Sequence, residues 1–178
     1  MADLRAIAGR VGYEWTMMLG AADTSWHLDT TLQTLNLPEK APLRVVHSHA
    51  RTELVWLHAR ELYAFLFIKP DPKSDDLSVT SFLDDQARQD WGKKEGLRGE
   101  DLCPTLKKHY KRANKKLFHL TAARLTDTSG LPDYTIPIDE LRRAFAKCYG
   151  LMAEAECVAF REGLDDEWDV ATVALTSP

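Results

Sequence analysis

The sequence contains no apolar run that approaches the roughly 20 residues of a transmembrane helix. Its N-terminal stretch also lacks the apolar block of a signal peptide, because Arg5, Arg10 and Glu14 interrupt it. We therefore expect a cytoplasmic protein that does not partner with a membrane. The whole-chain pI of 5.9 argues against a protein that coats nucleic acid over its entire surface, but it leaves a local basic site open.

Cysteine is also scarce. Cys103, Cys148 and Cys157 are odd in number and far apart, and no two of them form a CxxC pair. This pattern does not support a disulfide framework, so we expect reduced thiols, as in a cytosolic protein.

Recognisable metal-binding motifs are missing as well. Neither HExxH nor HxxxH occurs, and the i, i+2 spacing of His47 and His49 points their rings to different sides of a helix. We expect no metal and no cofactor. The competing hypothesis is a metal-binding bundle of the DinB-like kind. This hypothesis requires His47 or His58 to meet His109 or His119 across the bundle. His58, however, lies in an apolar stretch, which is typical of a core residue.

Few segments alternate apolar and polar residues, so the sequence predicts little β-structure. Helical periodicity, proline positions and turn formers instead predict four main helices, at about 4–19, 43–68, 104–124 and 138–160. A short helix is expected near 82–91, and residues 26–35 are either a continuation of the first helix or a short second one. A chain of 178 residues is typical of one domain. We therefore expect an all-α protein, an antiparallel four- to five-helix bundle over residues 1–163, followed by an acidic C-terminal tail at 164–178.

Positive charge is concentrated between Lys93 and Arg124. This segment has ten Lys or Arg and three acids, a net charge of about +7, whereas the whole chain carries −4 and the remainder therefore about −11. Apolar residues recur in its second half at steps of four and three, at Leu106, Tyr110, Ala113, Leu117 and Leu120. This spacing predicts one amphipathic helix with a cationic outer face, which favours an anionic partner and raises the question of nucleic-acid chemistry.

Arg112 and His119 lie on this basic segment. On an ideal helix a separation of seven residues places both on one face, with their Cα atoms about 10.5 Å apart. The structural interpretation is that Arg112 pairs with an acid and that His119 borders the core. The functional interpretation is that this polar pair faces a groove or a two-fold interface and takes part in nucleic-acid chemistry.

The sequence Arg112-Ala-Asn-Lys-Lys-Leu-Phe-His119 resembles the motif of the HEPN superfamily (higher eukaryotes and prokaryotes nucleotide-binding domains), in which His follows Arg after four to six residues. HEPN domains are helical bundles, often dimeric, and many are metal-independent ribonucleases of toxin–antitoxin, antiphage and CRISPR systems. In the family a polar residue often follows the Arg directly, whereas here Ala113 follows and the polar Asn114 comes one residue later. Residues 54–66 and 114–121 also look like those of a set of uncharacterised bacterial helical proteins.

The resemblance implies a metal-independent endoribonuclease of toxin or defence type, or a degenerate RNA-binding relative. His119 would act as the general acid–base and Arg112 would stabilise the phosphoryl charge. It further implies a homodimer in which two copies of the motif face each other, with RNA and an antitoxin-type protein as partners. RNA-backbone contacts would come from Lys108, Lys115 and Lys116, and accessory contacts from His109 and Asn114.

A different class of function is a non-catalytic helical interaction module. In that hypothesis the basic helix binds an acidic partner or the acidic end of its own chain, because residues 151–178 contain seven acids and one Arg.

Overall fold

A computed structural model of the protein describes residues 3–22, 34–36, 38, 42–69, 73, 77–92, 99–110 and 135–163. Over these residues the secondary structure is helical, without strands, which confirms the all-α prediction and a helical-bundle fold. The α-helices are α1 (Leu4–Ala22), α3 (Pro42–Phe67), α4 (Asp85–Gly92), α7 (Thr135–Tyr149) and α8 (Glu154–Gly163). Two 3₁₀ turns, η1 (Val79–Phe82) and η2 (Gly99–Leu102), accompany them, and residues 104–110 are also α-helical.

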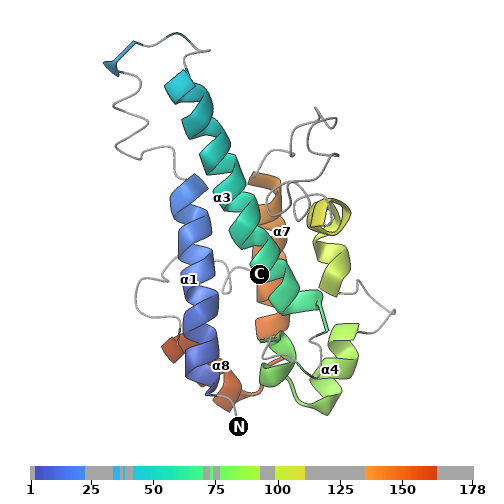
Figure 1. Ribbon diagram of the computed structural model, residues 1–178. Coiled ribbons are helices and arrows are strands. Elements are labelled where there is room, and N and C mark those ends of the chain that lie inside the picture. Colours follow the sequence, from blue (N-terminus) through green and yellow to red (C-terminus); the bar gives the residue numbers. More distant parts are fainter. Residues whose placement is uncertain are drawn as a thin grey trace.

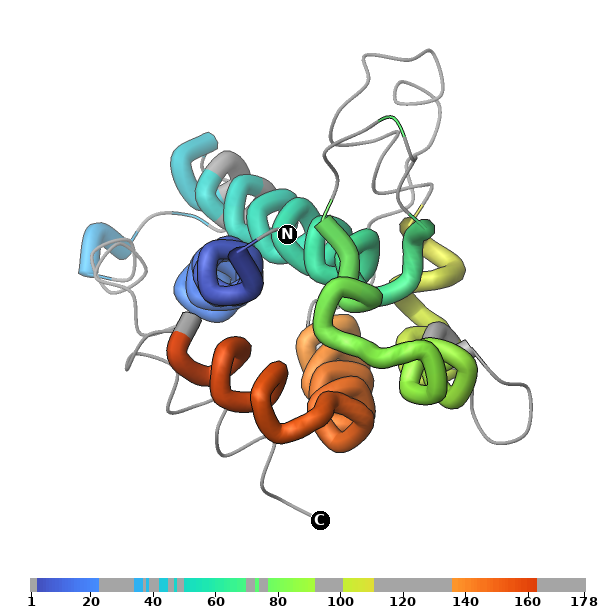
Figure 2. The backbone as a smooth tube through the Cα atoms, turned by 90° about the horizontal axis from the view of Figure 1, so that it is seen from below, coloured from blue at the N-terminus to red at the C-terminus, as the bar shows by residue number. Residues whose placement is uncertain are grey.

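The two long helices α1 and α3 lie side by side and run in opposite directions (Figure 1). α7 packs on α3, and α8 crosses beneath α1 (Figure 1; Figure 2 shows the same packing from below). The observed bounds of α1 and α3 are close to the predicted helices at about 4–19 and 43–68. None of the described helices is both long enough and apolar enough to cross a membrane.

α3 is the central helix because apolar side chains occupy several of its sides. Val55, Trp56, Ala59, Leu62, Tyr63, Phe65 and Leu66 are all buried. Pro42 is its first residue, where the missing N–H breaks no intrahelical bond. At its other end Trp91 donates its indole N–H to the Leu66 carbonyl at 3.1 Å, which satisfies one of the free carbonyls of the last turn.

Aromatic rings connect the helices at the centre of the bundle. The ring centroids of Trp15 and Phe145 are 5.6 Å apart, those of Phe82 and Phe160 are 5.2 Å apart, and Phe65 stacks on Phe145 at 6.4 Å. These five residues belong to five different elements, so one aromatic cluster holds α1, α3, η1, α7 and α8 together.

The helix expected near 82–91 begins later, at Asp85. The Asp84 carboxylate accepts the Ala87 N–H at 2.7 Å and so caps the N-terminus of α4. The residues before it form η1 instead of the first turn of the same helix.

The prediction of one helix over about 138–160 is wrong. α7 begins earlier and ends at Tyr149, and α8 begins at Glu154. The N–H groups of Leu151 and Met152 bond to carbonyls only three residues back, at 3.0 and 3.2 Å, so the α-helical bonding pattern ends there. The turn redirects α8 across α1, which buries Phe160. The predicted helix at 26–35 lies mostly outside the described residues, as does the acidic tail at 164–178.

Candidate functional site

The start of the 104–110 helix, within the basic segment, is fixed by a buried carboxylate from α7. Pro104 is the first residue of the 104–110 helix, so the next free backbone donors belong to Thr105 and Leu106. Glu140, which is only 2% exposed, accepts these two N–H groups at 2.9 and 3.0 Å. A carboxylate at a helix N-terminus is favoured both by charge-assisted hydrogen bonds and by the helix dipole. α7 therefore holds the first turn of the 104–110 helix in place.

The inward face of the 104–110 helix packs on α3. Leu106 is buried, the His109 ring packs edge-on against Trp56 with centroids 6.1 Å apart, and Tyr110 packs on Tyr63 at 5.2 Å. These inward positions follow the predicted apolar stripe, extended by His109. The predicted amphipathic helix is thus confirmed over residues 104–110.

The outward face of the same helix is cationic. Lys107 and Lys108 are exposed, and the Lys107 ammonium lies 3.6 Å from a carboxylate oxygen of Asp101. Of the predicted site residues, the structure therefore describes Lys108 on the outer surface and His109 half-buried against Trp56. The other predicted site residues, Arg112, Asn114, Lys115, Lys116 and His119, lie outside the described residues.

A groove of about 610 Å³ adjoins the end of this described helix, between α1, α3 and Tyr110. Its lining combines charged and apolar side chains: Arg10, Val11, Glu14, Arg60, Glu61, Leu62, Ala64, Phe65, Ile68, Leu77 and Tyr110. This volume is within the range of about 300–1,000 Å³ that is typical of small-molecule sites. The groove therefore offers a second candidate site beside the basic segment.

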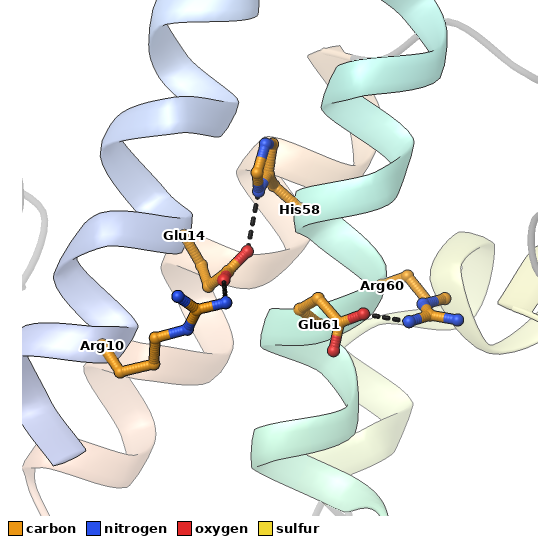
Figure 3. Close-up of polar contacts among 5 residues, drawn as sticks. All are labelled: Arg10, Glu14, His58, Arg60 and Glu61. Atoms are coloured by element: carbon orange, nitrogen blue, oxygen red, sulfur yellow. Dashed lines mark hydrogen bonds and ion pairs between the residues drawn. The ribbon is translucent and has the colours of Figure 1, made fainter. Parts of the chain in front are cut away.

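The α1 side of the groove rests on a buried polar pair (Figure 3). Nδ1 of His58 lies 2.7 Å from Oε2 of Glu14, and both side chains are buried. The other oxygen of Glu14 pairs at 2.7 Å with Arg10, whose side chain is 63% exposed and whose guanidinium lies 5.0 Å from the centre of the Tyr13 ring. Both oxygens of Glu14 are thus engaged, and the carboxylate fixes the position of Arg10 at the mouth of the groove.

The hydrogen bond also fixes the tautomer of His58. Nδ1–H donates to the carboxylate, and Nε2 is buried without a hydrogen-bond partner among the described residues. His58 therefore connects α3 to α1 as a buried core residue, which agrees with its place in an apolar stretch of the sequence.

The role of Glu14 was missed from the sequence, although a signal was present. Glu14 occupies the place of an apolar residue in the series Ile7, Val11, Glu14 and Met18, whose steps are four, three and four. A carboxylate in the core stripe of a helix predicts a buried polar partner on a neighbouring helix.

The α3 side of the groove carries a second charged pair. Arg60 hydrogen-bonds to the neighbouring Glu61, and their side chains are 18% and 39% exposed. Figure 3 shows Glu14 on α1 reaching toward His58, and Glu61 on α3 with its carboxylate turned toward Arg60. The polar part of the groove therefore holds two guanidinium groups and two carboxylates.

No family model, curated protein or solved structure matches the chain. These comparisons neither support nor contradict the resemblance to HEPN domains.

In the described part of the chain, no three His, Cys, Asp or Glu side chains are grouped as a metal site requires. Cys103, Cys148 and Cys157 are free thiols. Burial, followed by the negative charge of Glu140, raises the pKa of Cys103 to about 12, and burial also raises the pKa of Cys148. Neither of these two thiols is suited to act as a nucleophile at neutral pH.

Proposed function

We propose that the protein is a HEPN-like, RNA-binding endoribonuclease that cleaves single-stranded RNA without a metal ion. In this proposal Arg112 and His119 are the catalytic residues. The observation that carries the proposal is the anchored 104–110 helix of the basic segment, which Glu140 caps and on whose outer face Lys107 and Lys108 are exposed. Such a cationic surface on an otherwise acidic chain suits the sugar–phosphate backbone of RNA.

The connection between the groove and the motif supports the same proposal. Tyr110 lines the groove, and Arg112 follows it by only two residues. Chain connectivity limits the separation of their Cα atoms to about 7 Å. The motif therefore begins next to the groove along the chain.

The proposed reaction is transfer of a phosphoryl group within the RNA. The ribose 2′-OH oxygen attacks the adjacent phosphorus, the bond from phosphorus to the 5′ oxygen breaks, and a 2′,3′-cyclic phosphate and a 5′-OH are formed. The neutral imidazole of His119 accepts the proton of the 2′-OH, and the leaving 5′ oxygen takes up a proton from the resulting imidazolium. The Arg112 guanidinium stabilises the charge that develops on the phosphoryl oxygens.

The proposal includes a cytoplasmic homodimer. The resemblance implies two copies of the motif facing each other, which brings an Arg of one chain near a His of the other. This arrangement removes the difficulty that Arg112 and His119 of one ideal helix lie about 10.5 Å apart. It also leaves room for an antitoxin-type protein that blocks the paired site in a toxin or defence system.

Cleavage of a fluorescent single-stranded RNA in the presence of EDTA tests the proposal. His119→Ala should lose about 10²–10⁴ in rate, and Arg112→Ala about 10²–10³. Arg142→Ala is the matched control, because this exposed Arg on α7 pairs with Asp139 and is remote from the motif in sequence. Binding without cleavage by the wild type would identify a degenerate RNA-binding relative, and the absence of both would favour the interaction module.

A further inference from the structure

The groove between α1 and α3 is electrically balanced, which makes it unlike the basic segment beside it. Its lining contains Arg10, Arg60, Glu14 and Glu61, so the formal charges cancel. A phosphate in this position would face two carboxylates as well as two guanidinium groups. The balance fits a neutral ligand that offers hydrogen-bond donors and acceptors on one edge and an apolar surface elsewhere.

An aromatic ladder ends at the groove. The ring centroids of Tyr110 and Tyr63 are 5.2 Å apart, those of Tyr63 and Phe67 are 4.9 Å apart, and Phe67 stacks nearly parallel on Trp91 at 5.5 Å. Tyr63 is 4% exposed, so the interior of the ladder is fixed, whereas Tyr110 is half-buried and lines the groove. A rigid aromatic ring at the wall of a groove is the usual platform for an unstacked nucleobase.

The free hydrogen-bonding groups in the groove select one kind of base. Glu14 has both oxygens engaged, but Arg10 is mostly exposed and uses only part of its guanidinium on Glu14. Glu61 is 39% exposed and holds Arg60 with one oxygen. Arg10 from α1 and Glu61 from α3 thus both line the groove, and they offer it guanidinium donors and a carboxylate acceptor.

We propose that this groove binds one unpaired guanine of the RNA, so that the protein selects its substrate by base as well as by charge. Glu61 accepts the N1–H and N2–H of the guanine, Arg10 donates to O6 and N7, and the ring packs against Tyr110. Among the RNA bases, guanine is the one that presents two adjacent N–H donors to a carboxylate together with an acceptor pair for a guanidinium. This inference rests on the proposed function, because it names the substrate class of the same protein.

Binding of two hexaribonucleotides, all-adenine and the same sequence with one central guanine, tests the inference. Fluorescence anisotropy is measured on the full chain carrying His119→Ala, so that the RNA stays intact. The guanine-containing RNA should bind about 5- to 100-fold more tightly, which is the discrimination of one good bidentate contact. Glu61→Gln should abolish this preference and leave the affinity for the all-adenine RNA within about twofold.

Three comparisons make the result specific. Glu53→Gln, at an exposed Glu eight residues earlier on α3, should keep the preference for guanine. Lys108→Ala should weaken both RNAs equally and reduce the salt dependence by roughly one phosphate contact. Tyr110→Leu should weaken the guanine-containing RNA more than the all-adenine RNA if the base lies in the groove.

The outcomes separate the inference from the proposed function. Equal affinity for the two RNAs, or a preference that survives Glu61→Gln, would overturn the guanine site while leaving RNA binding intact. If neither RNA binds at low salt, the proposed function fails and the guanine site fails with it.

Discussion

Replacing His58 with Phe removes the donor that Glu14 binds at 2.7 Å and leaves a buried carboxylate with one partner, the mostly exposed Arg10. A hydrogen bond to a charged group contributes about 1.5–3 kcal/mol to stability. A buried carboxylate that loses its partner is also no longer compensated for the free energy of its desolvation. The contribution of Arg10 is small, below about 1 kcal/mol, because its side chain is screened by solvent. We expect His58→Phe to lower the free energy of unfolding by about 2–3 kcal/mol.

The complementary change, Glu14→Met, leaves the Nδ1–H of His58 buried without an acceptor. Its cost should also be about 2–3 kcal/mol. The double variant removes both polar groups and replaces them with apolar side chains, so no group is left unsatisfied. The double variant should therefore be more stable than the sum of the single changes predicts, with a coupling energy of about 1.5–3 kcal/mol.

Urea unfolding of the four proteins, followed by circular dichroism at 222 nm, measures this coupling. The exposed pair of Arg142 and Asp139, with side chains 38% and 66% exposed, is the control. Its coupling energy should stay below about 1 kcal/mol. If the Glu14 and His58 changes add to within about 0.5 kcal/mol, the buried pair does not stabilise the contact between α1 and α3.

Three further outcomes follow from the described contacts and the proposed assembly. Glu140→Ala should cost about 1–3 kcal/mol, because the buried N–H of Leu106 and the partly buried N–H of Thr105 lose their acceptor. Hydrogen exchange at these two residues should accelerate selectively, and unchanged exchange there would contradict the cap. At pH 8 a thiol reagent should modify Cys103 about 10³-fold more slowly than an unfolded-chain thiol, because its pKa is about 12 instead of 9.0. Since the unfolded chain loses this proton first, stability should fall as the pH rises above about 9, and a rise would be inconsistent with the shift. Light scattering at tens of micromolar should show a homodimer, and a monomer alone would argue against the paired catalytic site.

Helix positions were predictable where local pattern and tertiary burial agree. Pro42 and the dense apolar sequence after it mark α3, and the stripe that begins at Leu106 marks the inward face of the 104–110 helix. The break between α7 and α8 was not predictable in the same way, because apolar residues continue through it. Met152 is buried within the turn itself, so the helical pattern of burial does not reveal where the chain changes direction.

Contacts between distant parts of the chain were the main features that could not be predicted from the sequence. Glu140 appears in the sequence as an ordinary acidic position on a helix, yet it caps a helix that begins 36 residues earlier, at Pro104. Glu14 and His58 are 44 residues apart, and the pairing exists only because α1 and α3 pack together. Periodicity predicts which face of a helix is buried, whereas the identity of the polar partner depends on the packing of the whole bundle.

Two residues of the predicted site, Lys108 and His109, are among the described residues. The exposure of Lys108 matches the predicted cationic face. His109 packs on Trp56, a structural contact that was not predicted from the sequence, where His109 was expected to contact RNA. The roles of Arg112 and His119 remain predictions from the motif. The groove beside Tyr110 was not predicted, because its lining joins residues from 10 to 110 in sequence.

The most direct test of the ribonuclease proposal replaces a single oxygen of the substrate. A single-stranded RNA cleaved by the wild-type protein in EDTA is mapped, and the ribose at the main cleavage site is then changed to 2′-deoxyribose. The proposal predicts 2′,3′-cyclic phosphate ends on the unmodified RNA, and no cleavage at the modified position, because the attacking 2′-OH is gone. Cleavage at the deoxyribose, or activity that His119→Ala retains in full, would contradict it.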